Sequence, residues 1–550
     1  MQKIIENQRS RAQESTAAIE RIYITMRHLF IRGFYKPMGV SGKTLRESLL
    51  TLRPEIYGSI AEQKVELDGL LYVMERLPKG IEECRYINLT SDEGYANSHF
   101  KTIIPQKRRR NCYRIDDEQM NIEITRGRSD IYDVLTHLTF LYIESHKIME
   151  NVVIENGNDL TRDWEKLKTA TRKSKLNQKE KEIAISHSAN ILGRTFMEVN
   201  FIYDKFSSPK DPHRFLKIIY NLGKLALDEL NQNKKRVIIF SPILRERLGH
   251  HIHGEFWANT IKKILTSQKL IDKKLHIISA NMHSVMNTLY AKEALGEYCA
   301  DKSNFEIFEA LSDSNNQDLR QKVTTYAQAN GMTYIKDTSG TNIDVQIFDL
   351  SKYPKTESQD ILVVMDYAFG EQAYETMDEL LKPLLSKDKK RKYLDVDSIS
   401  IMGKAGILDG GKGDIMIPNA HLFEGTADNY PFKNELNTND FKGYDLDVFE
   451  GTMVTVLGTS LQNKELLKFF HNSTWNVIGL EMEGAHYQKA IQAASRLRGN
   501  ISPDIKIRYA YYASDNPLKT GSTLAQGGLG TTGVKPTYLI TEKILKQILD

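Results

Sequence analysis

The sequence predicts an α/β protein of two domains: a mostly α-helical N-terminal domain over residues 1–232 and an α/β domain over residues 233–550. Three observations lead to this prediction. The chain of 550 residues is longer than one ordinary hydrophobic core requires. Apolar residues recur at helical spacing in the first part of the chain. In the second part, short β-branched segments alternate with amphipathic helical segments.

The helical domain is predicted from three amphipathic segments, over residues 15–35, 131–153 and 212–232. Polar connectors rich in charged residues separate them, around 103–119 and 162–182. No internal repeat stands out. These patterns predict helices that each turn one apolar face toward a shared core.

The α/β domain is predicted from seven short apolar segments, which we interpret as strands. They are Val237–Phe240, Leu275–Ser279, Ile361–Met365, Ile399–Met402, Met453–Leu457, Val477–Leu480 and Ile505–Ala513. Helical patterns between them favour a largely parallel sheet with helices on both faces. In open α/β sheets, ligands bind beyond the carboxyl ends of strands, so the residues that follow these segments are the first candidates for a site.

The overall charge and the cysteine content limit the expected partners and compartment. The chain carries 75 basic and 71 acidic residues, and its net charge of +4 gives no general case for binding nucleic acid or a membrane surface. Its three cysteines are widely separated and odd in number, which fits a reducing cytoplasm. The N-terminal segment has no cleavable apolar core, and no apolar run is long enough to span a bilayer. We therefore expect a cytoplasmic protein without a membrane partner.

Two glutamates follow the strand predicted over Val477–Leu480. Glu481 and Glu483, with Met482 between them, stand where this apolar strand ends and a helical pattern begins. The side chains of that helix predicted to face inward are Tyr487, Ala490, Ile491, Ala494 and Leu497. Carboxylates at such a strand end are placed to bind a ligand. The alternative is a solvated helix N-terminus, where acidic side chains interact favourably with the helix dipole.

Three further strand ends carry glycine or acidic residues. Residues 399–420 contain five glycines before Asp414, and glycine lets a backbone approach a ligand closely, although a glycine-rich hairpin is the alternative. Gly370 lies between a predicted strand and a helical pattern, which is either an anion site or an ordinary turn. Ser514 and Asp515 end the last predicted strand, and an aspartate there is either a helix cap or a catalytic acid.

In this order, these segments resemble the motifs of the nucleoside phosphorylase and nucleosidase superfamily. Gly403–Leu408 with Gly413-Asp414 is similar to the G-x-A-G-x-L and G-D motifs of this superfamily. Glu481–Ala485 is similar to its E-M-E-G-A motif, and Ser514-Asp515 to its S-D motif. The likeness is closest to the AMP nucleosidase branch, which has a threonine-rich strand similar to 450–467 and a Pro-Leu pair similar to Pro517-Leu518. It covers roughly residues 360–550.

Two departures from the family pattern stand out. Lys404 occupies a position where the family usually has a small or neutral residue, and the glycine-rich phosphate loop is reduced to "AFGEQA" at 368–373. The resemblance implies a phosphorylase-type α/β/α domain with a mostly parallel or mixed central sheet. It also implies a homo-oligomer and no cofactor.

The resemblance implies hydrolysis of the N-glycosidic bond of a purine nucleotide or nucleoside, with release of the free base. Glu483 would hold the ribose hydroxyls and favour the oxocarbenium-like sugar, with Glu481 assisting and Met482 packing on the sugar. Asp515 would protonate or hydrogen-bond the departing purine at N7. The remaining residues implied to bind substrate are Ala405, Gly406, Gly370 and Ser514.

The sequence leaves alternatives open. Phosphate in place of water as the nucleophile would make the protein a phosphorylase, although the reduced loop at 368–373 favours hydrolysis. A non-catalytic nucleotide sensor or scaffold would bind nucleotide in the α/β domain and partners in the helical domain. The water-activating base is assigned only by position, to Glu246 after the strand over 237–240, and the alternative for this residue is a salt-bridged surface acid. The glycine- and threonine-rich segment 521–536 suits a lid over the substrate or an ordinary connector.

Two other segments were weighed for metal and nucleic acid. His250, His251 and His253 lie close to Glu255, but no second group of ligands is identifiable, so we expect no metal site. The basic segment 106–111 has the composition of a solvated loop, so we expect no nucleic-acid partner.

Overall fold

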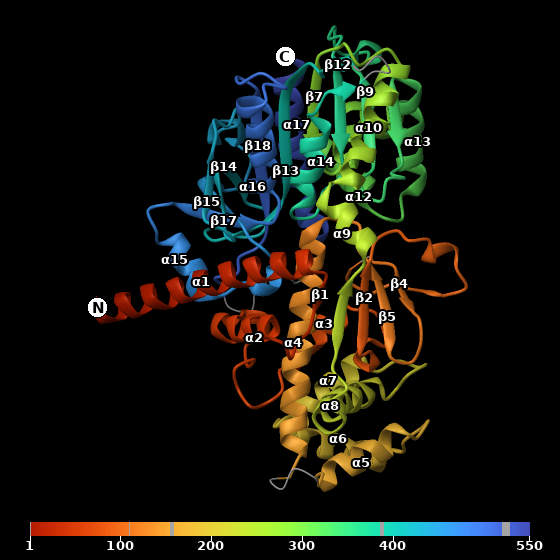
Figure 1. Cartoon of the computed structure of the whole chain (residues 1–550). Helices are drawn as coiled ribbons and strands as arrows, with labels where there is room; N and C mark the ends of the chain where they lie inside the picture. Colours follow the sequence, from red (N-terminus) through yellow and green to blue (C-terminus); the bar gives the residue numbers. More distant parts are fainter. Residues whose placement is uncertain (1, 109, 155–158, 386–389, 520–528) are drawn as a thin grey trace. The chain divides into compact units, whose positions relative to one another are not determined.

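The computed structural model describes residues 2–108, 110–154, 159–385, 390–519 and 529–550, with side chains from residue 10 onward (Figure 1). The chain forms two compact units, each built from segments that are distant in the sequence. The first unit comprises Met1–Ile124, Asp130–Arg247 and Ser460–Leu466. The second unit comprises Thr125–Ser129, Leu248–Thr459 and Leu467–Asp550.

Helices make up most of the first unit. Three of them match the predicted amphipathic segments: α1 (Gln2–Arg32), α4 (Arg128–Val152) and α8 (Arg214–Gln232). The others are α2 (Val40–Leu52), α3 (Leu67–Met74), α5 (Arg162–Thr171), α6 (Gln178–Leu192), α7 (Phe196–Phe206) and α9 (Pro242–Gly249), whose last residues belong to the second unit. These helices form because one face of each can be buried. In α8, for example, the apolar residues at helical spacing, such as Phe215, Ile219 and Leu222, are buried.

The first unit also contains a six-stranded mixed sheet, with the strand order β1-β6-β2-β5-β4-β3. Its strands are β1 (Phe34–Tyr35), β2 (Tyr86–Thr90), β3 (Thr102–Ile103), β4 (Cys112–Arg114), β5 (Gln119–Glu123) and β6 (Val237–Phe240). The sequence placed β6 at the start of the α/β domain, whereas it pairs with β1 and β2. The remaining strands were not predicted. β1, β3 and β4 have only 2 or 3 residues, and β2 and β5 mix polar with apolar residues and so do not form an apolar segment.

The second unit is built on a ten-stranded mixed sheet within the described chain. Its order is β15-β14-β16-β17-β13-β7-β10-β9-β8, and β18 pairs with both β13 and β14. The strands are β7 (Leu275–Ser279), β8 (Met332–Ile335), β9 (Val345–Asp349), β10 (Ile361–Met365), β13 (Val396–Ile407), β14 (Ile415–Phe423), β15 (Asp428–Pro431), β16 (Val448–Thr455), β17 (Val477–Glu481) and β18 (Lys506–Asp515). A short pair, β11 (Leu384–Leu385) and β12 (Arg391–Lys392), stands apart. The predicted α/β fold with a mostly parallel or mixed sheet is confirmed.

Helices cover both faces of this sheet, which gives the second unit three layers. One face packs against α10 (Ile252–Ser267), α14 (Gln372–Leu380) and α16 (Gly484–Gln492). The opposite face packs against α11 (Met282–Leu295), α12 (Asn304–Ser312), α13 (Gln317–Ala329) and α17 (Val534–Leu549). Side chains alternate along a strand, so the neighbours Ile277 and Ile278 belong to opposite cores.

One detail of the helix after Glu483 differs from the prediction. Leu497, predicted to face inward, is 84 % exposed. α16 ends at Gln492 and a π-helical turn over Ala493–Leu497 follows, which changes the angular spacing of the later side chains. None of the helices in the described ranges combines the length and apolar character that crossing a bilayer requires.

Candidate active site

The strand ends selected from the sequence meet at one edge of the ten-stranded sheet. β13 lies between β17 and β18, and Gly406 of β13 pairs with Leu480 of β17 and with Asp515 of β18. Neighbouring strands lie about 4.8 Å apart, so the backbones of Glu481 and Asp515 stand about 10 Å apart, with Ala405 and Gly406 between them. The structure therefore brings three of the predicted motif segments together.

Glu481 ends β17 as a buried residue, and both of its carboxylate oxygens are engaged. Its Oε1 accepts a hydrogen bond from Thr455 Oγ1, and its Oε2 accepts hydrogen bonds from the backbone N–H groups of Glu483 and Gly484, each at 2.5 Å. Burial and the nearby Glu483 raise the pKa of Glu481 to about 8, although the three donors oppose this shift. Glu481 thus holds the turn that carries Glu483.

Gly484 allows the helix after this turn to approach the sheet closely. A Cβ atom at this position would lie 2.3 Å from Cδ2 of His421 and 2.7 Å from the hydroxyl oxygen of Tyr511. Any other residue would force these side chains apart. Burial lowers the pKa of His421 to about 3, so this ring is neutral, and its Nε2 lies 3.0 Å from the Tyr511 hydroxyl oxygen.

Glu483 is half-buried at the start of α16 and contacts the loop after β10. Its Oε1 accepts a hydrogen bond of 2.8 Å from the backbone N–H of Gly370. Gly370 has a φ of 55°, which favours glycine, and a Cβ atom there would lie 2.4 Å from Ser129 Oγ. The same Ser129 oxygen accepts a hydrogen bond of 2.8 Å from the N–H of Glu371. Residues 125–129, which no motif indicated, therefore hold this loop in place.

Asp515 ends β18 as a buried carboxyl group. Ser514 Oγ lies 2.5 Å from its Oδ1 and 3.0 Å from the carbonyl oxygen of Ala405. Within the described part of the chain, the buried Oδ2 has no hydrogen-bond partner. Burial raises the pKa of Asp515, against the Ser514 hydrogen bond and the charges of Lys404 and Lys412. The carboxyl group thus keeps its proton to a higher pH than an ordinary aspartate does.

The glycine-rich segment between β13 and β14 is held by two side chains. Asn516 places its Nδ2 within 3.2–3.3 Å of three consecutive carbonyl oxygens, those of residues 408–410. Asp414 accepts hydrogen bonds from the backbone N–H groups of Gly411 and Asp447. Both oxygens of Asp414 therefore stabilise the loop.

The remaining sequence-based candidates are Met482, Glu246 and the segment 521–536. Met482 is half-buried in the turn between the two glutamates. Glu246 is exposed on α9 and belongs to the first compact unit, whereas the other candidates belong to the second. Of the predicted lid over 521–536, residues 521–528 lie outside the described residues, and α17 begins at Val534.

Among the described residues, His251, Asp378 and Glu379 form a group with the spacing of metal ligands. Lys382 pairs with both acids, at 3.2 and 2.5 Å, and Arg498 binds Asp378 at 2.5 Å. Because these cations balance the carboxylates, the group does not offer a metal the negative charge that it needs. The neighbouring His253 directs its Nδ1 to the carbonyl oxygen of Ser339 at 2.6 Å.

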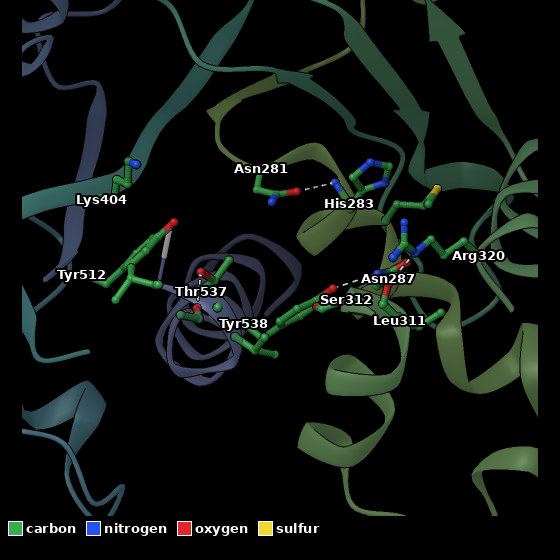
Figure 2. Close-up of a pocket in the computed structure, with 15 residues that line it drawn as sticks. Asn281, His283, Asn287, Leu311, Ser312, Arg320, Lys404, Tyr512, Thr537 and Tyr538 are labelled. Atoms are coloured by element: carbon green, nitrogen blue, oxygen red, sulfur yellow. Dashed lines mark hydrogen bonds between the residues drawn. The ribbon is translucent and has the colours of Figure 1, made fainter. Parts of the chain in front are cut away.

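A cavity of about 310 Å³ adjoins the strand ends, and Lys404 of β13 and Tyr512 of β18 line one part of it (Figure 2). Asn281 and His283, which follow β7 and begin α11, also line it. Neither residue was among the sequence-based candidates, although both follow the strand predicted over Leu275–Ser279, where a ligand site is expected.

The sequence matches the model of a family of unknown function, DUF6909, over residues 43–325 and 307–550. The chain therefore belongs to this family. No curated protein matches the sequence.

Several solved structures resemble about half of the chain. They include a 5'-methylthioadenosine/S-adenosyl homocysteine nucleosidase of Campylobacter jejuni (13% identity, TM-score 0.31, covering 50% of this chain and 98% of that one). A futalosine hydrolase of Helicobacter pylori has 12% identity and a TM-score of 0.31, with the same two coverages. A purine nucleoside phosphorylase of Schistosoma mansoni has 13% identity and a TM-score of 0.32, covering 54% of this chain and 97% of that one.

Proposed function

We propose that this member of the DUF6909 family hydrolyses the N-glycosidic bond of a purine nucleotide or nucleoside, in the manner of the AMP nucleosidase branch that its motifs resemble. The observation that supports the proposal most is the carboxyl group of Asp515. It is buried at a strand end, its Oδ2 has no partner among the described residues, and burial raises its pKa. A departing purine requires such a positioned proton donor.

Asp515 would act on the leaving group. When the bond between the ribose C1' and the purine N9 breaks, its electron pair moves onto the base, and the Asp515 carboxyl group would deliver a proton or hydrogen bond to N7. A positioned general acid typically contributes about 10²–10⁴-fold in rate. Water would then supply the oxygen that bonds to C1' and would release one proton to the solvent, and Asp515 would take up a proton from the solvent before the next turnover.

Glu483 would act on the sugar. A carboxylate beside the ribose hydroxyls would hold the substrate and favour the positive charge that develops on the ring. The N–H of Gly370 binds one of its oxygens, and Glu481 fixes the turn on which it sits. In this account Glu483 contacts substrate, whereas Glu481 is a positioning residue.

The geometry gives little support to the alternative of simple helix capping. Glu483 occupies the N-cap position of α16, yet its side chain makes no capping hydrogen bond. At the end of β18, it is Asn516, not Asp515, whose side chain accepts a backbone N–H, that of Leu518 at 3.0 Å. Capping alone therefore does not account for either acid.

The test is product analysis with purified full-length protein. We expect the protein to release adenine or hypoxanthine from AMP, ATP, adenosine or inosine without added phosphate. Chromatography of the reaction mixture would measure the released base. Turnover that depends on phosphate and yields ribose 1-phosphate would make the protein a phosphorylase. Tight nucleotide binding without release of base would identify a sensor, and would contradict the proposal.

A further inference from the structure

We propose that the exposed face of the first unit's sheet binds single-stranded nucleic acid. We call it the open sheet face. It carries the outward side chains of β1, β6, β2 and β5 and of the residues beside their ends: Arg32, Phe34, Lys36, Tyr86, Asn88, Gln119, Lys235, Val237 and Ile239. All of these residues belong to the first unit, so the inference is independent of the activity proposed for the second.

The two faces of this sheet differ in burial. Side chains alternate along a strand, and on one face Tyr35 and Ile238 are at most 2 % exposed. The Tyr35 hydroxyl oxygen lies 2.9 Å from Thr139 Oγ1, so helix α4 packs on this face. On the open sheet face, by contrast, Tyr86 is 40 % exposed and Ile239 is 42 % exposed. The sheet therefore has one covered face and one face that a partner can reach.

Strand pairing places the exposed side chains next to one another. Phe34 of β1 pairs with Ile239 of β6, which pairs in turn with Asn88 of β2. In the neighbouring row, Val237 of β6 pairs with Tyr86 of β2. Since neighbouring strands lie about 4.8 Å apart, these side chains form one continuous surface and are not scattered exposed residues.

Three cations border this surface. Arg32, Lys36 and Lys235 are exposed, and none of them forms an ion pair with a residue in the described ranges. The Phe34 ring holds two of them, because the guanidinium carbon of Arg32 lies 4.2 Å and Nζ of Lys36 lies 5.3 Å from the centre of this ring. The open sheet face therefore presents positive charge that the fold does not neutralise.

The acids near this face lie on the side of the sheet away from β1. Glu118, directly before β5, pairs with the buried Arg85 at 3.5 Å. Asp116 and Asp117 are exposed in the turn that precedes it. The net charge of +4, from which no nucleic-acid partner was expected, describes the whole chain and does not reflect this local excess of cations.

Tyr86 offers a ring on which a base can stack. Within the described part of the chain, this ring contacts no other aromatic ring and no cation. Bases stack on such rings whatever their sequence, and the phosphates that join them are bound by lysine and arginine. Asn88 donates to Asn121 Oδ1 at 3.1 Å, and its own Oδ1 is left to accept from a base or a ribose hydroxyl group. Ring, cations and amide thus match the repeating unit of a nucleic acid.

The spacing of the rings favours a chain of nucleotides over a single one. Phe34 and Tyr86 lie two strands apart, or about 10 Å across the sheet. A ligand that reaches both the Tyr86 ring and the cations around Phe34 is therefore longer than one base. A duplex keeps its bases paired and stacked on each other, whereas a single strand can turn a base onto a protein ring.

The experiment measures binding of the full-length protein to fluorescent single strands of about 12 uridines or thymidines by anisotropy, at about 50 and 200 mM salt. We expect binding that weakens as salt rises, because phosphate contacts release counterions. Tyr86→Ala should weaken binding by about 5- to 150-fold, the range for one stacked base. Lys36→Ala should reduce the slope of log affinity against log salt by about 0.7.

Tyr393→Ala is the matched control, because this tyrosine is 44 % exposed and belongs to the second unit. It should leave the affinity unchanged. Tyr86→Leu keeps an apolar side chain and removes the aromatic ring, so a loss of affinity in this variant separates stacking from a defect in folding. Binding of either strand supports the inference, and the ratio of the two affinities shows whether the face prefers RNA or DNA.

Three results would overturn the inference. The first is no binding of either strand at about 50 mM salt, or a duplex that binds as tightly as the single strand. The second is equal affinity of the Tyr86→Ala and Tyr393→Ala variants. The third is a protein dimer that binds no oligonucleotide and that Tyr86→Ala dissociates, because the open sheet face would then bind a second copy of the chain.

Discussion

Two buried glutamates, one in each unit, differ in the groups that bind them. Glu229 of α8 is 4 % exposed, and Glu481 of β17 is 5 % exposed. Burial alone would raise the pKa of Glu229, but Arg236, at 2.9 and 2.7 Å, and His146 lower it to about 2. Glu481 has only neutral donors among the described residues, and burial raises its pKa to about 8.

This contrast separates buried acids that are bound by cations from buried acids that have only neutral hydrogen-bond donors among the described residues. In the first unit, Arg110 is buried and forms ion pairs with both Asp130 and Asp133. At the strand ends of the second unit, Glu481 and Asp515 are buried, and no cation of the described ranges binds either of them. Raised pKa values at a strand end mark a candidate site, because such acids keep a proton that they can transfer.

The largest effect on stability is expected for Arg110→Ala. This substitution removes the buried cation that binds both Asp130 and Asp133, while Arg108 still contacts Asp133 at 3.1 Å, and breaking a buried pair costs about 3–5 kcal/mol. Urea unfolding of the variant would measure the loss. Lys43→Ala is the control, because its pair with Glu47 is 3.7 Å long and both side chains are more than 60 % exposed (69 % and 64 %), so little change is expected. Equal stability of the two variants would contradict the comparison.

Glu483→Gln should lower the rate of the reaction and change the stability of the fold much less. It removes a charge-assisted contact to the substrate of about 1.5–3 kcal/mol, which corresponds to a loss of roughly 10- to 150-fold in kcat/KM. Steady-state kinetics with AMP would show the loss, and thermal melting would show whether the fold is kept. Unchanged kinetics would remove Glu483 from the site.

Glu481→Gln should act first on stability. Glutamine keeps one acceptor oxygen for the two backbone N–H groups, but its amide nitrogen cannot accept the hydrogen bond that Thr455 Oγ1 donates, whereas either oxygen of the acid can, so the buried Thr455 hydroxyl group loses its acceptor. We expect a cost of about 1–3 kcal/mol in the free energy of unfolding. A variant as stable as the unsubstituted protein would show that these bonds do not hold the turn.

The smallest expected effect is a change in the free energy of unfolding with pH. The pKa of Glu481 rises from 4.5 to about 8 on folding, so the folded state holds a proton that the unfolded state releases, and stability should fall as pH rises between these values. Glu229 acts in the opposite direction, because its contribution is present above pH 4.5 and is lost as pH falls toward about 2. Denaturation from pH 5 to 8 should show a decline that Glu481→Gln reduces. Parallel curves would contradict the raised pKa.

The α/β fold of the second unit was predictable because its strands are buried on both faces. Ile361–Met365 is a continuous apolar segment, as expected for such a strand, and β10 has the same bounds. The sheet of the first unit was not predictable, since β1 has only 2 residues and its pairing with β6 joins segments far apart in the sequence. Local pattern carries no information on such a pairing.

Some residues of the candidate site were also predictable from the sequence, and others were not. The acids and glycines at strand ends could be found from the sequence, because strand ends and glycine chemistry are local signals. The contact of Ser129 with the Gly370 loop and the place of Arg320 beside the cavity depend on tertiary packing. Lys404 was visible as a departure from the family pattern, but its place beside the cavity depends on packing as well.

The most direct test of the central claim compares two strand-end aspartates of one sheet. Asp515→Asn keeps the shape and the Ser514 contact but removes the transferable proton. Asp349→Asn changes an aspartate at the end of β9 that pairs with Lys273 at 2.8 Å and whose pKa is lowered by this lysine, although burial opposes the shift. We predict that Asp515→Asn lowers the rate of adenine release by about 100-fold or more while AMP still binds, and that Asp349→Asn loses stability and keeps its rate. A folded Asp515→Asn protein with full activity would contradict the account.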